Sequence, residues 1–135
     1  MSLTIVAPCR MITENEAALC EAVKSDLGKP ETETKMMELL AVANEAVEQL
    51  EHLEEWSSPH KIPMSSLGVA NKMDRCQIRR EAKGVVLIIG AFNYPIQLSL
   101  MPLAGALAGG NVALMTPSEA SGASAQLMAD LISRY

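Results

Sequence analysis

The stretch of sequence that decides the fold is residues 84–119, GVVLIIGAFNYPIQLSLMPLAGALAGGNVALMTPSE. Its opening segment, residues 84–89 (GVVLII), is apolar at every position, as is typical of a parallel strand buried on both faces. A helix is predicted over residues 95–108, closed by two glycines, and a second strand over residues 111–115. The order strand, helix, strand predicts two parallel strands joined by a crossover helix.

The sequence after the second strand predicts one more helix. Ser118 or Ser121 is expected to cap it, and its apolar side is formed by Leu127, Leu131 and Ile132. Ligands of open parallel sheets bind beyond the carboxyl ends of the strands. Functional side chains are therefore expected in the two turns at those ends, residues 90–94 and residues 116–119.

Acidic side chains and helical patterns dominate the first half of the chain. Thr13 followed by Glu16 is typical of a capping box, in which two side chains satisfy free backbone N–H groups, so a helix is predicted to begin there. Gly28 and Pro30 are predicted to end this helix, because glycine adopts the left-handed cap and proline lacks an N–H.

A second helix is predicted from apolar residues at alternating spacings of three and four. These residues are Met36, Leu39, Leu40, Ala43, Ala46, Val47, Leu50 and Leu53. The opposite, solvent-facing side is assigned to Glu38, Glu45, Glu48, Glu51 and Glu55. We expect the apolar stripe to pack on the chain's own sheet, with a coiled-coil partner as the alternative.

The composition excludes several classes of protein. The 135 residues are 49% hydrophobic and 20% charged with a net charge of −5, which argues against a disordered chain and against a nucleic-acid-binding surface. The three cysteines, Cys9, Cys20 and Cys76, are too far apart for a zinc site, and His52 and His60 lack partners at ligand spacing. Polar residues and prolines interrupt the apolar stretch before it could span a bilayer. With free thiols and no signal-like leader, we expect a cytoplasmic protein.

We expect an α/β fold in three parts. Residues 1–60 form an amino-terminal helical segment, and residues 61–83 a connecting loop and strand. Residues 84–135 form a βαβα unit, which is half of a Rossmann-like domain.

Two residues of the predicted turns carry side chains suited to chemistry. Asn93 lies between two aromatic residues, and an amide in such a position can stabilise an oxyanion; the alternative is an Asx turn that caps the following helix. Glu119 can bind ribose hydroxyls, or it can complement the dipole of the last helix. Neither GxGxxG nor GxxxxGK[ST] is present, so neither of these phosphate-binding loops is predicted.

Residues 84–119 resemble the first strand-helix-strand unit of the aldehyde dehydrogenase family, in particular its fatty-aldehyde, class 3-like branch. The corresponding family motifs are GVVLIIGxWNYP and KPSE. The resemblance extends more weakly back to about Arg10 and forward to Tyr135. It implies that residues 84–135 are part of an NAD(P)-binding domain of the aldehyde dehydrogenase fold. It also implies oxidation of aldehydes to carboxylic acids through a cysteine thiohemiacetal, with hydride transfer to NAD or NADP.

The resemblance assigns roles to four residues. Asn93 matches the oxyanion-stabilising Asn of the family, and Phe92 stands where the family has a Trp that contacts the cofactor. Glu119 matches the acid that binds the adenosine ribose. Thr116 stands where the family has Lys, and because Thr is shorter and uncharged, we expect weak cofactor binding and no preference for NADP.

The family's Cys nucleophile and Glu general base lie downstream of this unit, and none of the three cysteines sits in a nucleophile motif. We therefore expect the 135-residue chain alone to be inactive, as a fragment, a truncated gene model or a degenerate copy. The alternative is a non-catalytic pseudoenzyme or interaction subunit that pairs with a full-length relative. Unpaired strand edges are expected to favour homo- or hetero-oligomers.

Overall fold

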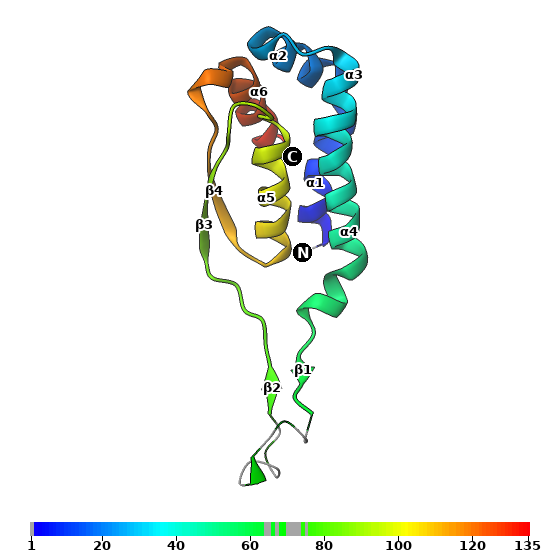
Figure 1. Ribbon diagram of the computed structural model, residues 1–135, viewed down its shortest axis with the longest axis vertical. Helices are drawn as coiled ribbons and strands as arrows, with labels where there is room; N and C mark the ends of the chain where they lie inside the picture. Colours follow the sequence, from blue (N-terminus) through cyan, green and yellow to red (C-terminus); the bar gives the residue numbers. More distant parts are fainter. Residues whose placement is uncertain (1, 64–65, 67, 70–73, 75) are drawn as a thin grey trace.

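The computed structural model describes residues 2–63, 66, 68–69, 74 and 76–135, which form an α/β fold built in layers. The elements are α1 (Ser2–Glu14), α2 (Glu16–Leu27), α3 (Glu31–Thr34), the π-helical turn η1 (Lys35–Leu39), α4 (Leu40–Ser57), β1 (His60–Lys61), β2 (Gln77–Ile78), β3 (Val85–Ile89), α5 (Gln97–Ala108), β4 (Val112–Thr116), the 3-10 turn η4 (Glu119–Ser121) and α6 (Gly122–Ile132). Helix α5 lies between the β3–β4 pair on one side and α1 and α4 on the other (Figure 1).

Strands β3 and β4 are parallel, as the sequence predicts. Their register runs from Val85 opposite Val112 to Ile89 opposite Thr116. Helix α5 connects them and packs against both strands. The predicted order of strand, helix and strand is confirmed, although α5 begins at Gln97 instead of at residue 95 and β4 is displaced by one residue.

The outer face of the β3–β4 pair differs from the predicted burial. Ile88 is buried under α5, but Val85 and Ile89 are 73% and 75% exposed. Leu87 and Leu114 are exposed as well. Within the part of the chain that the structure describes, α5 covers one face of the pair and no element packs on the other. The prediction of a strand buried on both faces is therefore wrong for this chain.

The first two helices differ from the prediction at their junction. Thr13 lies in the last turn of α1, where its Oγ1 donates to the carbonyl of Cys9 at 2.9 Å. The predicted capping box of Thr13 with Glu16 is wrong, because this hydroxyl is already bonded within the preceding helix. The end of α2 is as predicted, since Gly28 has a φ of 69° and donates its N–H to the carbonyl of Lys24.

The long helical stretch from α3 to α4 buries a face that matches the predicted one only in part, at Leu39 and Ala46. Its buried side chains are Thr34, Glu38, Leu39, Val42, Ala46 and Gln49. Met36, Leu40 and Val47, which were assigned to the apolar stripe, are exposed, whereas Glu38, which was assigned to solvent, is fully buried. A π-helical turn holds an extra residue and rotates the side chains that follow it, and both α1 and α5 pack along the rotated face.

The main hydrophobic core lies between the helices. Its buried members are Met11, Ile12, Leu19, Cys20, Val23, Leu39, Val42, Ile96, Leu100, Met128 and Leu131. They come from the amino-terminal helices and from the βαβα unit alike. The two halves of the sequence therefore share one core, which the break in composition did not indicate.

Helix α6 is capped by a carboxylate of α2. Oδ1 of Asp26 accepts the N–H of Ala123 at 3.0 Å, and Oδ2 accepts the N–H of Ser124 at 2.8 Å. Ser118 accepts a backbone N–H in the short turn η4, but Ser121 makes no side-chain capping bond to α6. The predicted serine cap is confirmed for the turn and wrong for the helix.

The segment between the two halves carries a short antiparallel ribbon. His60 of β1 is paired with Ile78 of β2, and the ribbon projects beyond the helices at the lower end of Figure 1. Residues 64–65, 67, 70–73 and 75 of the predicted connecting segment lie outside the described residues. Among the helices that the structure describes, none is both long and apolar enough to cross a membrane.

Helix α5 meets the end of β3 in a very close contact at Gly90. A methyl group at this position would lie 2.5 Å from Oγ of Ser99 and 3.5 Å from Cα of Pro117. Ser99 is buried, and its hydroxyl has no hydrogen-bond partner among the described residues. The preference for glycine at position 90 therefore comes from the space beside the Ser99 hydroxyl and not from the backbone angle.

The Asp26 cap predicts a pH-dependent contribution to stability. Burial raises the pKa of Asp26, but the N–H and hydroxyl of Ser124 and the N–H of Ala123 outweigh it and hold the pKa below the ordinary value of 3.8. Because the folded pKa is depressed, this contribution is complete above about pH 4 and is lost as the pH falls through the lowered pKa. Asp26→Ala should lower the free energy of unfolding by about 0.5–2 kcal/mol at pH 7.

Urea denaturation from pH 7 to pH 2.5 measures this difference, with Glu21→Ala, an exposed carboxylate on the same helix, as the control. The gap between the native chain and Asp26→Ala should close below about pH 4. A gap that does not change with pH would contradict the role of the carboxylate.

The contact at Gly90 predicts a rescue. Gly90→Ala should lower the free energy of unfolding by about 1–3 kcal/mol, because the new methyl group overlaps a buried hydroxyl. Adding Ser99→Ala removes that hydroxyl and should restore most of the loss, since Cβ of Ser99 lies 3.7 Å away, an ordinary contact distance. Thermal and urea denaturation of the two single variants and the double variant test this. Equal instability of Gly90→Ala with and without Ser99→Ala would show that the backbone, and not the hydroxyl, excludes alanine.

Candidate functional site

The two turns predicted to face a ligand adjoin at the carboxyl edge of the β3–β4 pair. Ile89 is opposite Thr116, and the N–H of Gly90 donates to the carbonyl of Thr116 at 3.0 Å. Residues 90–94 and residues 116–119 therefore leave the sheet side by side. These turns carry the four residues singled out from the sequence, Phe92 and Asn93 on one, Thr116 and Glu119 on the other.

Asn93 is exposed, and so is Phe92, at 54%. The alternative role of Asn93, a cap on the following helix, is not observed among the described residues. No side chain of the preceding turn caps α5, and its first N–H groups bond elsewhere. Asn93 is thus an exposed residue at the sheet edge whose side chain does not cap α5.

The first N–H groups of α5 are bonded by Glu38, which reaches them from η1. Its Oε2 accepts the N–H of Ile96 at 2.9 Å and, at a longer 3.4 Å, the N–H of Gln97. Its Oε1 lies 3.0 Å from Nζ of Lys29. The amino terminus of a helix favours a nearby negative charge, and the ammonium group of Lys29 neutralises the charge of Glu38. This fully buried carboxylate therefore has a partner on each of its two oxygens.

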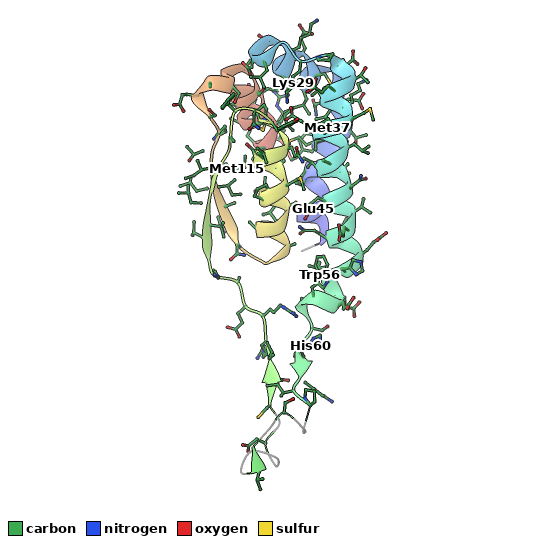
Figure 2. The ribbon with its side chains drawn as sticks, in the orientation of Figure 1. Lys29, Met37, Glu45, Trp56, His60 and Met115 are labelled. Atoms are coloured by element: carbon green, nitrogen blue, oxygen red, sulfur yellow. The ribbon has the colours of Figure 1, made fainter. Side chains whose placement is uncertain are left out.

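Lys29 connects this buried carboxylate to the Asn93 turn. Its Nζ donates to the backbone carbonyl of Asn93 at 2.6 Å and lies 3.7 Å from the centre of the Tyr94 ring. Figure 2 shows Lys29 at the end of the molecule where α2 and α3 meet the start of α5. The ion pair of Lys29 and Glu38, two residues of the amino-terminal half, therefore contacts the loop that carries Asn93 and anchors its backbone.

The second turn offers hydroxyl and carboxylate groups. Thr116, the last residue of β4, and Glu119, the first residue of η4, are both exposed. These groups can hydrogen-bond the hydroxyls of a ribose. Neither turn contains a Lys or an Arg to pair with a phosphate.

The three cysteines are free thiols that lie on other elements. Cys9 is on α1, Cys20 is on α2, and Cys76 precedes β2. Burial, with the nearby charge of Glu31, raises the pKa of the Cys20 thiol. A raised pKa reduces the thiolate fraction and hence the nucleophilicity of that sulfur.

The histidines lie far from this edge. His52 stacks on Trp56 with ring centres 5.2 Å apart, and Figure 2 shows Trp56 near the lower end of α4 and His60 below it, both well away from Lys29. Among the described residues, no three His, Cys, Asp or Glu side chains gather at a site that could hold a metal ion.

Two hollows lie away from the predicted site residues. One, of about 460 Å³, is lined by Ala7, Pro8, Met11, Leu103, Leu107, Asn111, Val112, Ala113, Ile132 and Tyr135. The other, of about 290 Å³, is lined by Ala17, Cys20, Glu21, Lys24, Pro30 and Glu31. Neither of these two hollows includes Asn93.

Sequence reasoning missed Glu38 and Asp26, the two carboxylates that bond the amino termini of α5 and α6. The signal for Glu38 was its place within the apolar run MMELL, residues 36–40, where a charged side chain needs a partner. Asp26 carries no comparable signal, because it lies among polar residues near the end of α2.

Comparison with known proteins gives one consistent family. The model of the aldehyde dehydrogenase family matches residues 6–135. The dimeric NADP-preferring aldehyde dehydrogenase of Rattus norvegicus is 38% identical, over 93% of this chain and 27% of its own length. The aldehyde dehydrogenase family 3 comG protein of Dictyostelium discoideum is 40% identical, over 93% of this chain and 26% of its own length.

The fold leads to the same family. The substrate-bound structure of AldH from Staphylococcus aureus superposes with a TM-score of 0.92 and 29% sequence identity, over 98% of this chain and 28% of that protein. The chain spans about a quarter of the length of these relatives. On sequence and fold together, the chain belongs to the aldehyde dehydrogenase family.

Proposed function

We propose that this chain contributes an oxyanion-stabilising amide and one wall of a cofactor site to the NAD(P)-dependent oxidation of an aldehyde to a carboxylic acid. The observation that carries the proposal is the exposed position of Asn93 at the shared carboxyl edge of β3 and β4, with no capping role on α5. Membership of the aldehyde dehydrogenase family supports the reaction class.

In this reaction, a thiolate adds to the aldehyde carbonyl, and negative charge develops on the carbonyl oxygen. The side-chain amide of Asn93 donates a hydrogen bond to that oxygen and stabilises the charge. Loss of one such donor raises the barrier by roughly 3–4 kcal/mol. None of the described thiols is suited to be the nucleophile, because they lie on α1, on α2 and before β2.

The residues at the edge fit part of a nicotinamide dinucleotide, either NAD or NADP. When bound, such a cofactor would supply the hydride acceptor that the oxidation needs. Glu119 and Thr116 would bond ribose hydroxyls, and Phe92 would form an apolar wall against the cofactor. With no cation in either turn, the edge favours NAD over a cofactor that carries an additional ribose phosphate.

The alternative proposal is a non-catalytic interaction subunit that pairs with a full-length relative. It is favoured by the exposed apolar face of the two-stranded sheet, which includes Val85, Ile89 and Val112. Each of these strands has one hydrogen-bonded neighbour in the described sheet, so each has an open edge that another strand could pair with.

The proposed function predicts that the purified 135-residue chain oxidises no aldehyde. The oxyanion donor alone provides no nucleophile, and the Cys20 thiol is buried with a raised pKa. Formation of NADH or NADPH from medium- and long-chain aldehydes, followed by absorbance, measures this. Turnover above a buffer blank that survives Cys→Ser replacement of all three thiols would reveal a catalytic group outside this proposal.

The proposed function also predicts how tightly the chain binds NAD and NADP. Calorimetric titration should give a dissociation constant of millimolar or weaker for NAD, and no preference for NADP. Thr116→Lys should strengthen binding roughly tenfold to a hundredfold, because a charge-assisted hydrogen bond contributes about 1.5–3 kcal/mol. Thr32→Lys, which adds the same charge at an exposed position on α3, should have no effect. Micromolar binding of NADP by the unmodified chain would overturn the role given to Thr116.

A further inference from the structure

We propose that Lys29 and Glu38 are positioning residues that fix the Asn93 loop for catalysis. The inference rests on the proposed function of Asn93 as the oxyanion donor. It assigns to two residues of the amino-terminal helices a task at a site that neither of them forms directly.

Glu38 fixes the far side of the loop, where α5 begins. It is fully buried, and its Oε2 takes the N–H of Ile96 at 2.9 Å and that of Gln97 at 3.4 Å. These are N–H groups that no residue of the preceding turn caps. A negative charge at this point binds them more strongly than a neutral acceptor would. The orientation of the first turn of α5 therefore depends on a residue 58 positions earlier in the chain.

Lys29 fixes the near side of the loop. Its side chain is 13% exposed, and its ammonium group is shared between Oε1 of Glu38 at 3.0 Å and the carbonyl of Asn93 at 2.6 Å. The ring of Tyr94 lies 3.7 Å from the same nitrogen, which adds a cation–π contact. One ion pair thus holds both ends of the segment from Asn93 to Gln97.

This arrangement fixes the backbone of Asn93 while its amide stays exposed. The carbonyl of Asn93 itself is bonded, so the remaining freedom of the amide is rotation about its own side-chain bonds. Misplacement of a reacting group by about 1 Å can lower the rate by on the order of a hundredfold, so such a constraint matters for an oxyanion donor. The neighbouring Phe92 and Ala91 are exposed, and among the described residues the ion pair makes no hydrogen bond to them.

The π-helical turn is the local feature that belongs with this task. It spans Lys35–Leu39, and Glu38 faces α5 from within it. Such turns in helices occur frequently at functional sites. An ion pair that served stability alone could lie anywhere in the fold. This one contacts the loop that carries Asn93, the proposed oxyanion donor.

Amide hydrogen exchange, measured by NMR on the full 135-residue chain, tests the proposal. The double variant Lys29→Met/Glu38→Gln removes both charges, so neither is left buried without a partner, and it keeps the side-chain volumes. The readout is the exchange rate of Ile96 and Gln97 divided by that of Val23 and Val42, buried residues of α2 and α4. A role in stability alone speeds all four amides together and leaves this ratio unchanged.

We expect the ratio to rise roughly five- to tenfold in the double variant, because charge-assisted bonds are replaced by neutral ones or lost. The backbone amide of Asn93 should also show increased motion in its heteronuclear NOE. The matched control is Lys35→Met, which removes a lysine whose ion pairs with Glu16 and Glu31 lie on the surface, and it should leave the ratio unchanged.

An unchanged ratio in a folded double variant would overturn the proposal. So would global unfolding of the double variant while Lys35→Met stays folded, since the pair would then hold the whole fold and not this loop. The outcome does not depend on cofactor or aldehyde binding. A raised ratio together with failed cofactor titrations would therefore leave the loop constraint standing and reject only the proposed function.

Discussion

The junction between the amino-terminal helices and the start of α5 depends most on one buried carboxylate, that of Glu38. A charge taken out of water needs partners on both oxygens, and it finds them in two backbone N–H groups and the ammonium group of Lys29. Ile96 and Gln97 lie 58 and 59 positions after Glu38 in the sequence, and Lys29 lies nine positions before it. The bonds from Glu38 to the N–H groups of Ile96 and Gln97 therefore join the amino-terminal helices to the βαβα unit.

Asp26 repeats this logic at the other helix of the unit. Its carboxylate bonds the first N–H groups of α6, as that of Glu38 bonds those of α5. Both helices of the βαβα unit are thus capped from the amino-terminal half, and a shared apolar core fills the space between them. The carboxyl edge of β3 and β4 is thus in contact with the amino-terminal helices, at Asn93 through Lys29 and at η4 through α2.

The sequence predicted what depends on local patterns. The apolar runs predicted β3, α5 and β4, and the two turns that follow the strands did prove to adjoin. It failed where tertiary partners decide. Glu38 was assigned to solvent because helical spacing alone cannot reveal a π-helical turn or a distant lysine. The prediction that both faces of β3 are buried was wrong. An apolar sequence indicates that a strand face can pack against another element, but it does not show that the described chain supplies such an element.

A double-mutant cycle tests the central claim, that Lys29 and Glu38 act as one unit where the amino-terminal helices meet the start of α5. Urea denaturation gives the free energy of unfolding of the native chain, Lys29→Met, Glu38→Gln and the double variant. Each single variant leaves one partner unpaired, so the double variant should lose less than the sum of the two losses, with a coupling energy of about 1–3 kcal/mol. Losses that add to within about 0.5 kcal/mol would contradict the claim.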